Sequence, residues 1–175
     1  MSNQHVRSPT AISFREVRGR FPVSGFHCHH IIPIEIVERR SLAVFFGHVR
    51  AHGFDPNDFS INGTHLPSTE LQAAAFGLPL HRGGHPRYNE MVGDMIAPLT
   101  RMDPILASAG LRQLQFRLRT ALRPNRATPV IRSRGCFPAN ADFRRLDAAV
   151  DMLWGTAAPV LGGPDPAELS RLAMP

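Results

Sequence analysis

A histidine pair at the end of an apolar run constrains this chain more than any other feature. Residues 26–32 are predicted to form a strand that places His29 and His30 side by side and ends before Pro33. Because successive residues of a strand point to opposite faces, the two imidazoles cannot easily serve one ion in the same way. One metal ligand and one general base is the natural division, since imidazole performs both functions near neutral pH.

Two further histidines stand four positions apart in the block His81-Arg82-Gly83-Gly84-His85. A short strand over residues 61–67, opened by Asn62-Gly63, lies between the two histidine groups. This ordered block favours a shared site for His29, His30, His81 and His85. Taken alone, Asn62-Gly63 is most often a turn, and the HxxxH lacks the neighbouring Glu of a zinc protease. We expect ordinary surface or core roles for the other histidines, which are His5, His27, His48, His52 and His65.

The rest of the pattern predicts an α+β chain that is mostly helical. At 175 residues it has room for one domain. We expect an irregular lead-in over residues 1–25, a compact core over 26–99 and a basic helical extension over 100–175 packed on the same domain. Apolar spacing and Pro or Gly boundaries predict the helices. They span residues 34–52, 86–96, 104–123 and 142–153, with one possible helical turn at 70–76 and a loop at 124–140.

Charge is unevenly distributed along the chain. All 20 basic residues are Arg, a bias that a GC-rich genome also produces without selection for function. Residues 101–145 carry ten Arg against two Asp, net +8, whereas residues 27–100 are net −2. Arginine matches phosphate geometry, so the segment after the histidines is suited to a nucleic-acid backbone. Such attraction raises affinity without selecting a sequence.

Membrane and redox signals are weak. No run of about eighteen uncharged apolar residues is present, so we expect no membrane insertion. The first 25 residues lack the apolar block of a conventional secretory signal. Cys28 and Cys136 make no disulfide framework and no thiolate zinc site, and we interpret both as reduced.

Four short motifs follow one another in a specific order between residues 26 and 99. They are His29-His30-Ile31-Ile32-Pro33, Gly53-Phe54-Asp55, Asn62-Gly63-Thr64-His65-Leu66-Pro67 and His81-Arg82-Gly83-Gly84-His85-Pro86-Arg87-Tyr88. Together they resemble the AHH group of the HNH, or ββα-metal, endonuclease superfamily. Cys28 stands where that family commonly has Ala. The resemblance implies a ββα-metal core with additional helices.

The resemblance also implies a role for each matching residue. His29, His81 and His85 would bind one divalent metal ion, with Mg, Mn, Zn and Ni all open. His30 would be the general base, and Asn62 would brace the loop that orients it.

Several cationic or aromatic residues are candidates for contacting nucleic acid. Arg82 and Arg87 flank the proposed metal ligands, and Tyr88 follows them, although its helical spacing equally suits the core. Two alternatives for the Arg-rich helix are docking of an acidic partner and a solvated helix face. The full set is Arg82, Arg87, Tyr88, Arg112, Arg117 and Arg119.

The resulting functional prediction is a metal-dependent endonuclease that cuts DNA, with RNA less favoured, and has little sequence preference. Resemblance implies an antibacterial toxin made in the bacterial cytoplasm without a signal peptide, delivered to the cytoplasm of a target cell and neutralised by a cognate immunity protein. Two alternatives remain. One is a mobile-element or phage endonuclease that cuts at specific sites, and the other is a non-enzymatic module that binds a structural metal.

Overall fold

The computed structural model describes residues 11–123 and 146–157. Its helices and strands follow in the order α1 (Phe14–Arg20), β1 (Phe26–His30), α2 (Ile34–Val37), η1 (Arg40–Leu42), α3 (Ala43–Ala51), α4 (Phe59–Asn62), β2 (Gly63–Pro67), α5 (Glu70–Phe76), α6 (Pro86–Ile96), η2 (Ala97–Arg101), α7 (Pro104–Ala121), η3 (Leu146–Ala149) and α8 (Val150–Ala157). The fold is mixed and mostly helical, as predicted. Among the described residues, no helix is long and apolar enough to cross a membrane.

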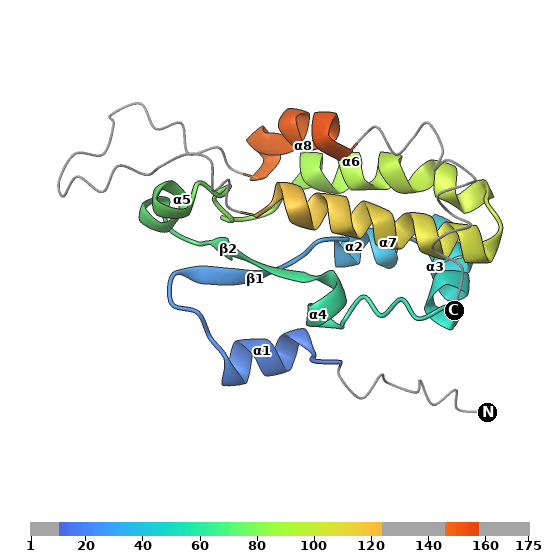
Figure 1. Cartoon of the computed structure of the whole chain (residues 1–175), viewed down its shortest axis with the longest axis horizontal. Helices are drawn as coiled ribbons and strands as arrows, with labels where there is room; N and C mark the ends of the chain where they lie inside the picture. The colour runs from blue at the N-terminus through green and yellow to red at the C-terminus, as the bar shows by residue number, and fades with distance from the viewer. Residues whose placement is uncertain (1–10, 124–145, 158–175) are drawn as a thin grey trace.

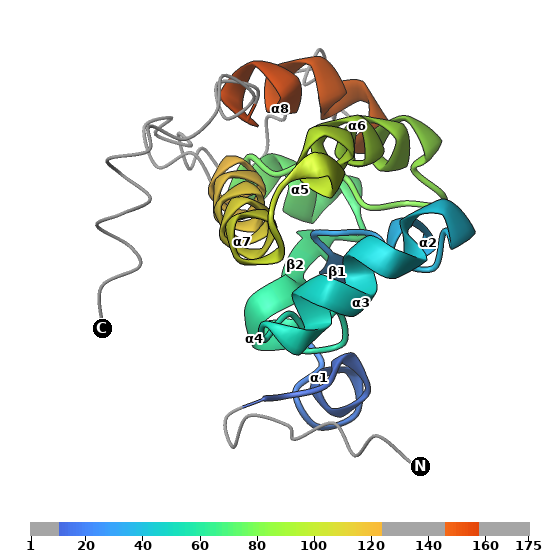
Figure 2. The same cartoon turned by 90° about the vertical axis from the view of Figure 1, so that its right-hand side faces the viewer.

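Strands β1 and β2 pair antiparallel at the centre of the molecule. The register places Phe26 opposite Pro67 and His30 opposite Gly63. Helix α1 lies on one side of this pair, while α6, α7 and α8 lie on the other (Figure 1). Figure 2 shows the same order from a second side, with α2 and α3 flanking the strands. The strand pair is therefore held between two unequal helical layers.

The hydrophobic core lies mainly on the side of the strands away from α1. Ile31 and Ile32, directly after β1, are fully buried with Leu66 of β2. Apolar side chains of α3, α6, α7, η3 and α8 belong to the same buried cluster. The end of β1 is thus anchored in the core just past the histidine pair.

Helix α1 corrects the prediction of an irregular lead-in over residues 1–25. The Ser13 hydroxyl accepts a hydrogen bond from the Glu16 N–H at 3.2 Å, and the Glu16 carboxylate accepts one from the Ser13 N–H at 2.9 Å. This reciprocal capping box begins the helix. Phe14 and Val17 then bury its inner face.

The helix predicted over residues 34–52 is broken into α2, η1 and α3. Residues 38–41 are all exposed, so no buried side chain holds them in a continuous helix. Arg39 takes an extended backbone conformation, with φ −60° and ψ 124°. The periodic apolar residues on either side still reach the core, which is why the two helical segments were joined in the prediction.

The strand predicted over residues 61–67 begins only at Gly63. Ile61 and Asn62 instead end the short helix α4, whose N-cap Asp58 accepts a hydrogen bond from the Ser60 N–H. A Cβ added to Gly63 would lie 2.6 Å from the Phe59 carbonyl oxygen. The glycine is therefore required by a close approach to α4 and not by turn geometry, because its φ is −109°.

The remaining helix predictions agree with the structure or lie partly outside it. The predicted helices at 86–96 and 104–123 correspond to α6 and α7, and the turn at 70–76 is the two-turn helix α5, which ends at the left-handed Gly77. The predicted loop at 124–140 and the start of the helix expected at 142 lie outside the described residues. The end of that helix corresponds to η3 and α8.

Candidate metal centre and catalytic base

Three histidines from separate elements converge beside the strand pair. His29 lies on β1, His81 follows α5, and His85 immediately precedes α6. One ring nitrogen from each lies within 4.8 Å of those of the other two. The His81 N–H donates to the Pro67 carbonyl oxygen at 2.7 Å, which ties the loop carrying His81 to the end of β2. The strand, loop and helix start therefore place all three imidazoles around one point.

The chemical state of these imidazoles suits a divalent cation. His29 is 4% exposed, and its Nε2 atom is buried without a hydrogen-bond partner among the described residues. Burial is the main reason that the pKa of His29 falls well below its usual value, and His81 and His85 lower it further. Such a buried, neutral and unpartnered nitrogen is an available metal ligand.

The other two imidazoles are neutral for similar reasons. Burial, with His85 and His27 adding to it, lowers the pKa of His81 to about 4. Burial also lowers the pKa of His85, although the Asp147 and Glu35 carboxylates oppose the shift. Metal ligation requires neutral imidazole, so the three side chains fit the ion that the sequence predicted at this position.

His30 occupies a different environment from His29, although the two are adjacent in β1. Its ring stacks on Phe14 of α1, with centroids 3.6 Å apart and planes inclined by 13°. Burial lowers the pKa of His30, Arg18 lowers it further, and Glu35 opposes the shift. A neutral, half-buried imidazole is able to accept a proton.

Asn62 is fully buried and binds the segment that follows His30. Its Oδ1 accepts a hydrogen bond from the Ile32 N–H at 2.8 Å. Its Nδ2 donates to the carbonyl oxygens of Ile32 and Pro56, both at 3.0 Å. The Asn62 side chain thus fixes the backbone two residues beyond His30, and its influence on catalysis remains a prediction.

Residues 15–123 match the model of a nuclease family of the HNH/ENDO VII superfamily with conserved AHH. The chain belongs to the AHH nuclease family. Neither a curated protein nor a solved structure matches it.

Within the AHH motif, this chain carries Cys28 in place of the alanine. The Cys28 Sγ atom lies 3.8 Å from His65 Nε2, and burial raises the pKa of the thiol. Cys28 is not part of the three-histidine cluster. The substitution therefore leaves the candidate metal ligands of this AHH nuclease unchanged.

Tyr88 corrects one predicted nucleic-acid contact. The residue is 0% exposed, and its hydroxyl donates to the Ile31 carbonyl oxygen at 2.7 Å. Its ring also packs against His29, with centroids 5.2 Å apart. Tyr88 is consequently a core residue of the AHH nuclease that packs against the histidine strand, and it is not available to substrate.

Arg119 corrects a second predicted contact. Its guanidinium donates to the carbonyl oxygens of Ser60 at 2.8 Å and Gly63 at 3.2 Å, and also to that of Ile61. These acceptors lie at the junction of α4 and β2, which carries Asn62. Arg119 is therefore engaged in holding this junction, with three hydrogen bonds from its guanidinium to backbone carbonyl oxygens.

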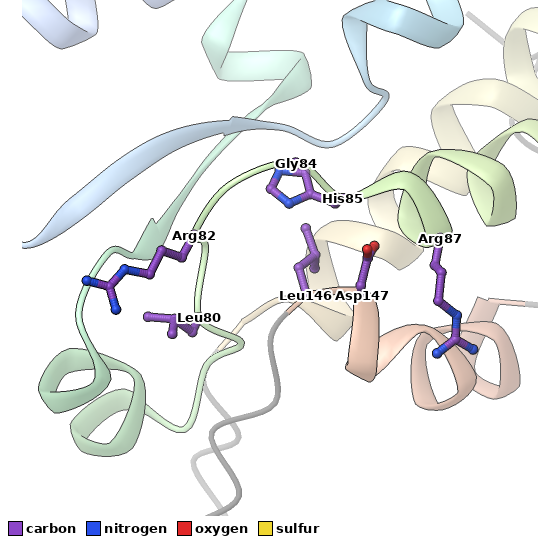
Figure 3. A pocket seen from close by; sticks show the side chains of 7 residues that line it. All are labelled: Leu80, Arg82, Gly84, His85, Arg87, Leu146 and Asp147. Atoms are coloured by element: carbon purple, nitrogen blue, oxygen red, sulfur yellow. The ribbon is translucent and has the colours of Figure 1, made fainter.

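The other predicted arginine contacts lie at or near the surface. Arg82 and Arg87 are exposed and line a pocket of about 300 Å³ together with His85 (Figure 3). Arg112 is exposed and approaches the His52 carbonyl oxygen at 3.4 Å, while Arg117 is half-buried on α7. Arg82 and Arg87 thus stand close to the candidate ligands in the chain, with the Arg87 side chain extending away from His85 (Figure 3), whereas Arg112 and Arg117 lie on α7.

Sequence reasoning missed three residues that contact the site of this AHH nuclease. Gln115 of α7 donates to Asn62 Oδ1 at 3.2 Å. The Nδ1 atoms of His27 and His81 lie 3.4 Å apart. Asp147 accepts a hydrogen bond from the Tyr88 N–H at 2.9 Å. His27 sits beside the histidine pair in the sequence, but no local signal marks Gln115 or Asp147.

Proposed function

We propose that this chain is a divalent-metal-dependent endonuclease that hydrolyses DNA with little sequence preference. The observation that carries the proposal is a three-histidine cluster together with a separate neutral histidine. This fourth residue, His30, is adjacent to the cluster residue His29 on β1. Membership of a nuclease family supports phosphodiester hydrolysis as the reaction.

His29, His81 and His85 would hold the metal ion. Bound there, the ion would polarise the scissile phosphate and stabilise the departing oxygen. Three imidazoles favour zinc or nickel by affinity, whereas magnesium or manganese suits phosphate oxygens. The proposal accordingly leaves the choice among Mg, Mn, Zn and Ni to experiment.

His30 would remove a proton from the attacking water. Its neutral ring has the lone pair that this step needs, and Phe14 restricts the plane in which the ring lies. The resulting hydroxide would attack phosphorus, the bond to the 3′ oxygen would break, and that oxygen would take a proton from water, while the proton held by His30 would return to solvent. Asn62 would keep the backbone after His30 in position by its bonds to Ile32.

Two pockets that each include one of the candidate metal ligands support binding of a polynucleotide. One, of about 350 Å³, is lined by Arg18, His27 and His81 among others. The second, of about 300 Å³, is lined by Arg82, His85 and Arg87 among others (Figure 3).

Backbone contacts would supply affinity without sequence selection. Exposed Arg82 and Arg87 lie close to the candidate metal, and residues 101–145 add a net charge of +8. Arginine contacts to phosphate position a duplex but do not read its bases. We therefore expect DNA to be cut at many sites, and we include RNA as a competing substrate in the test.

The biological role that we propose is that of an antibacterial toxin with a cognate immunity protein. Family resemblance supports this role, together with delivery into the cytoplasm of a target cell. Expression of the wild-type chain in bacteria should stop growth, whereas His30→Ala should not. Rescue by the product of an adjacent gene would support an immunity partner, and harmless expression of an active nuclease would contradict the toxin role.

A direct assay tests the enzymatic proposal. Purified protein is incubated with supercoiled plasmid or with RNA, in EDTA or in Mg²⁺, Mn²⁺, Ni²⁺ or Zn²⁺. We expect plasmid relaxation and fragmentation with at least one metal, none in EDTA and none for His30→Ala. His48→Ala is the matched control, because His48 is an exposed histidine of α3 outside the cluster. Cleavage of RNA alone would overturn the DNA assignment, and metal binding without any cleavage would favour a structural-metal module.

A further inference from the structure

Residues 146–157 lie beyond the part of the chain that matches the nuclease family, yet they pack against the helix that begins at the metal centre. The family match ends at residue 123. Helix α8 lies along α6 in both views (Figures 1 and 2). Leu146 and Leu153 are fully buried in the common core. This segment is therefore an integral layer of the fold.

Three contacts join this segment to the stretch that carries His81 and His85. The Leu146 N–H donates to the Leu80 carbonyl oxygen at 3.2 Å, directly before His81. The Asp147 carboxylate accepts from the Tyr88 N–H at 2.9 Å, in the first turn after His85. Arg87 and Asp151 form an exposed ion pair at 3.5 Å. The first two contacts lie on either side of the candidate ligands His81 and His85 in the chain.

The start of α6 explains why an outside carboxylate is needed. His85 occupies the N-cap position, where a side chain normally accepts a hydrogen bond from the first turn. The His85 side chain makes no such bond, and its imidazole is directed to the three-histidine cluster. Pro86 at the first helical position has no N–H to satisfy, but the Tyr88 N–H lies in the first turn, where no carbonyl of the helix can accept it, and so it requires an acceptor from outside. Asp147 supplies that acceptor from another element.

The same carboxylate stands next to the candidate metal ligand. His85 and Asp147 line one pocket, and Figure 3 shows Arg87 extending away from them toward α8. A negative charge at a helix N-terminus is favourable. The hydrogen bond from Tyr88 to Asp147 also fixes the first turn of α6, and so it fixes the backbone from which His85 reaches the metal position.

We propose that Asp147 is a positioning residue of the metal centre, which caps α6 in place of His85 and thereby frees the His85 imidazole for the ion. The inference rests on the proposed function only in that the three-histidine cluster binds a cation. Residues 146–157 then belong to the functional unit, together with the region that matches the family.

The test compares Asp147→Ala, Asp147→Asn and Asp151→Asn in the full chain. Calorimetry with Ni²⁺ or Zn²⁺ gives the affinity, and thermal unfolding without metal reports the cap. Asp147→Ala should weaken metal binding by about tenfold, because the first turn after His85 loses its acceptor and the backbone that carries the imidazole is no longer held in place. It should also lower the unfolding temperature by several degrees, because a helix cap is lost. Asparagine keeps a carbonyl acceptor, so Asp147→Asn should recover most of both losses.

Asp151→Asn is the matched control for charge. It removes one negative charge from the same segment, as the Asp147 variants do, but the only interaction lost is the exposed ion pair with Arg87. Metal affinity should therefore change by less than about threefold. Wild-type affinity in a folded Asp147→Ala variant would overturn the inference. Equal losses in Asp147→Asn and Asp147→Ala would also overturn it, since charge and not capping would then carry the effect. Should Asp147→Ala not fold, Asp147→Asn alone decides: affinity within about threefold of wild type supports the inference, and a loss of about tenfold overturns it. A wild-type chain that binds no cation would instead refute the proposed function.

Discussion

Phe14 and His30 lie face to face, with ring centroids 3.6 Å apart and planes inclined by 13°. One ring comes from α1 and the other from β1, so the short N-terminal helix directly contacts the proposed catalytic base. A neutral imidazole accepts a proton only along its ring plane. The stacking partner therefore restricts the direction from which His30 can act.

Replacement of Phe14 by Leu should lower turnover with little change in metal affinity. Leucine keeps most of the buried volume but loses the flat stacking surface, which is worth about 0.5–1.5 kcal/mol and hence roughly two- to tenfold in rate. Steady-state plasmid cleavage and calorimetry measure the two quantities. Phe21→Leu is the control, because Phe21 is 58% exposed. Turnover that is identical in both variants would remove Phe14 from the site.

His30→Ala should abolish measurable cleavage while leaving metal binding largely intact. A positioned general base contributes about 10²–10⁴-fold in rate, whereas His30 stands outside the three-histidine cluster. Cleavage assays and calorimetry with the same metal are compared. If the variant loses its metal, the roles of His29 and His30 are reversed or shared.

His81→Ala and His85→Ala should each reduce both metal affinity and activity. Each substitution removes one of three ring nitrogens that lie within 4.8 Å of one another. Calorimetry should detect the weaker binding before any substrate is added. A variant with normal affinity and full turnover would exclude that histidine as a ligand.

Asn62→Ala should destabilise the fold and lower activity, with a smaller effect on metal affinity. The change leaves the Ile32 N–H buried without its acceptor, and an unsatisfied buried group costs about 1–3 kcal/mol. Chemical denaturation gives the free energy of unfolding. Unchanged stability would argue against the bracing role of Asn62.

Removal of charge from α7 should weaken the salt dependence of DNA binding. Each lost phosphate contact reduces the slope of log affinity against log salt by about 0.9. The informative variant is Arg112→Gln with Arg117→Gln. Arg119→Gln is kept separate, because its guanidinium binds the backbone of the α4–β2 junction and its loss should chiefly lower stability. An unchanged slope in the double variant would favour a protein partner for this face.

The sequence was most informative where apolar periodicity was long or motifs were ordered. Helices α6 and α7 were predicted because their buried faces repeat over three turns or more. Helix α1 was missed because it buries only Phe14 and Val17, although the Ser13 and Glu16 capping pair was visible. The capping pair therefore indicated a helix start, but the Gly and Pro residues around it favoured an irregular segment in the prediction.

Only part of the site could be predicted from the sequence, because short motifs are visible there and long-range contacts are not. The three candidate ligands belong to short motifs, so their meeting was foreseeable. The bonds from Gln115 to Asn62 and from Tyr88 to Asp147 join residues 53 and 59 positions apart. Such contacts depend on how whole helices pack. The burial of Tyr88 and the backbone hydrogen bonds of Arg119 likewise depend on helix packing. Residue type alone therefore could not predict them.

The two-residue repeat of β1 has a consequence for how this site tolerates change. His29 faces the histidine cluster and His30 faces Phe14 because consecutive strand residues alternate. Insertion or deletion of one residue within Phe26–His30 would exchange these faces, since a shift of one position inverts every side chain. A substitution, such as Cys28 in the alanine position, leaves each side chain on its own face. The length of this strand, and not only its composition, therefore sets the geometry of the proposed catalytic site.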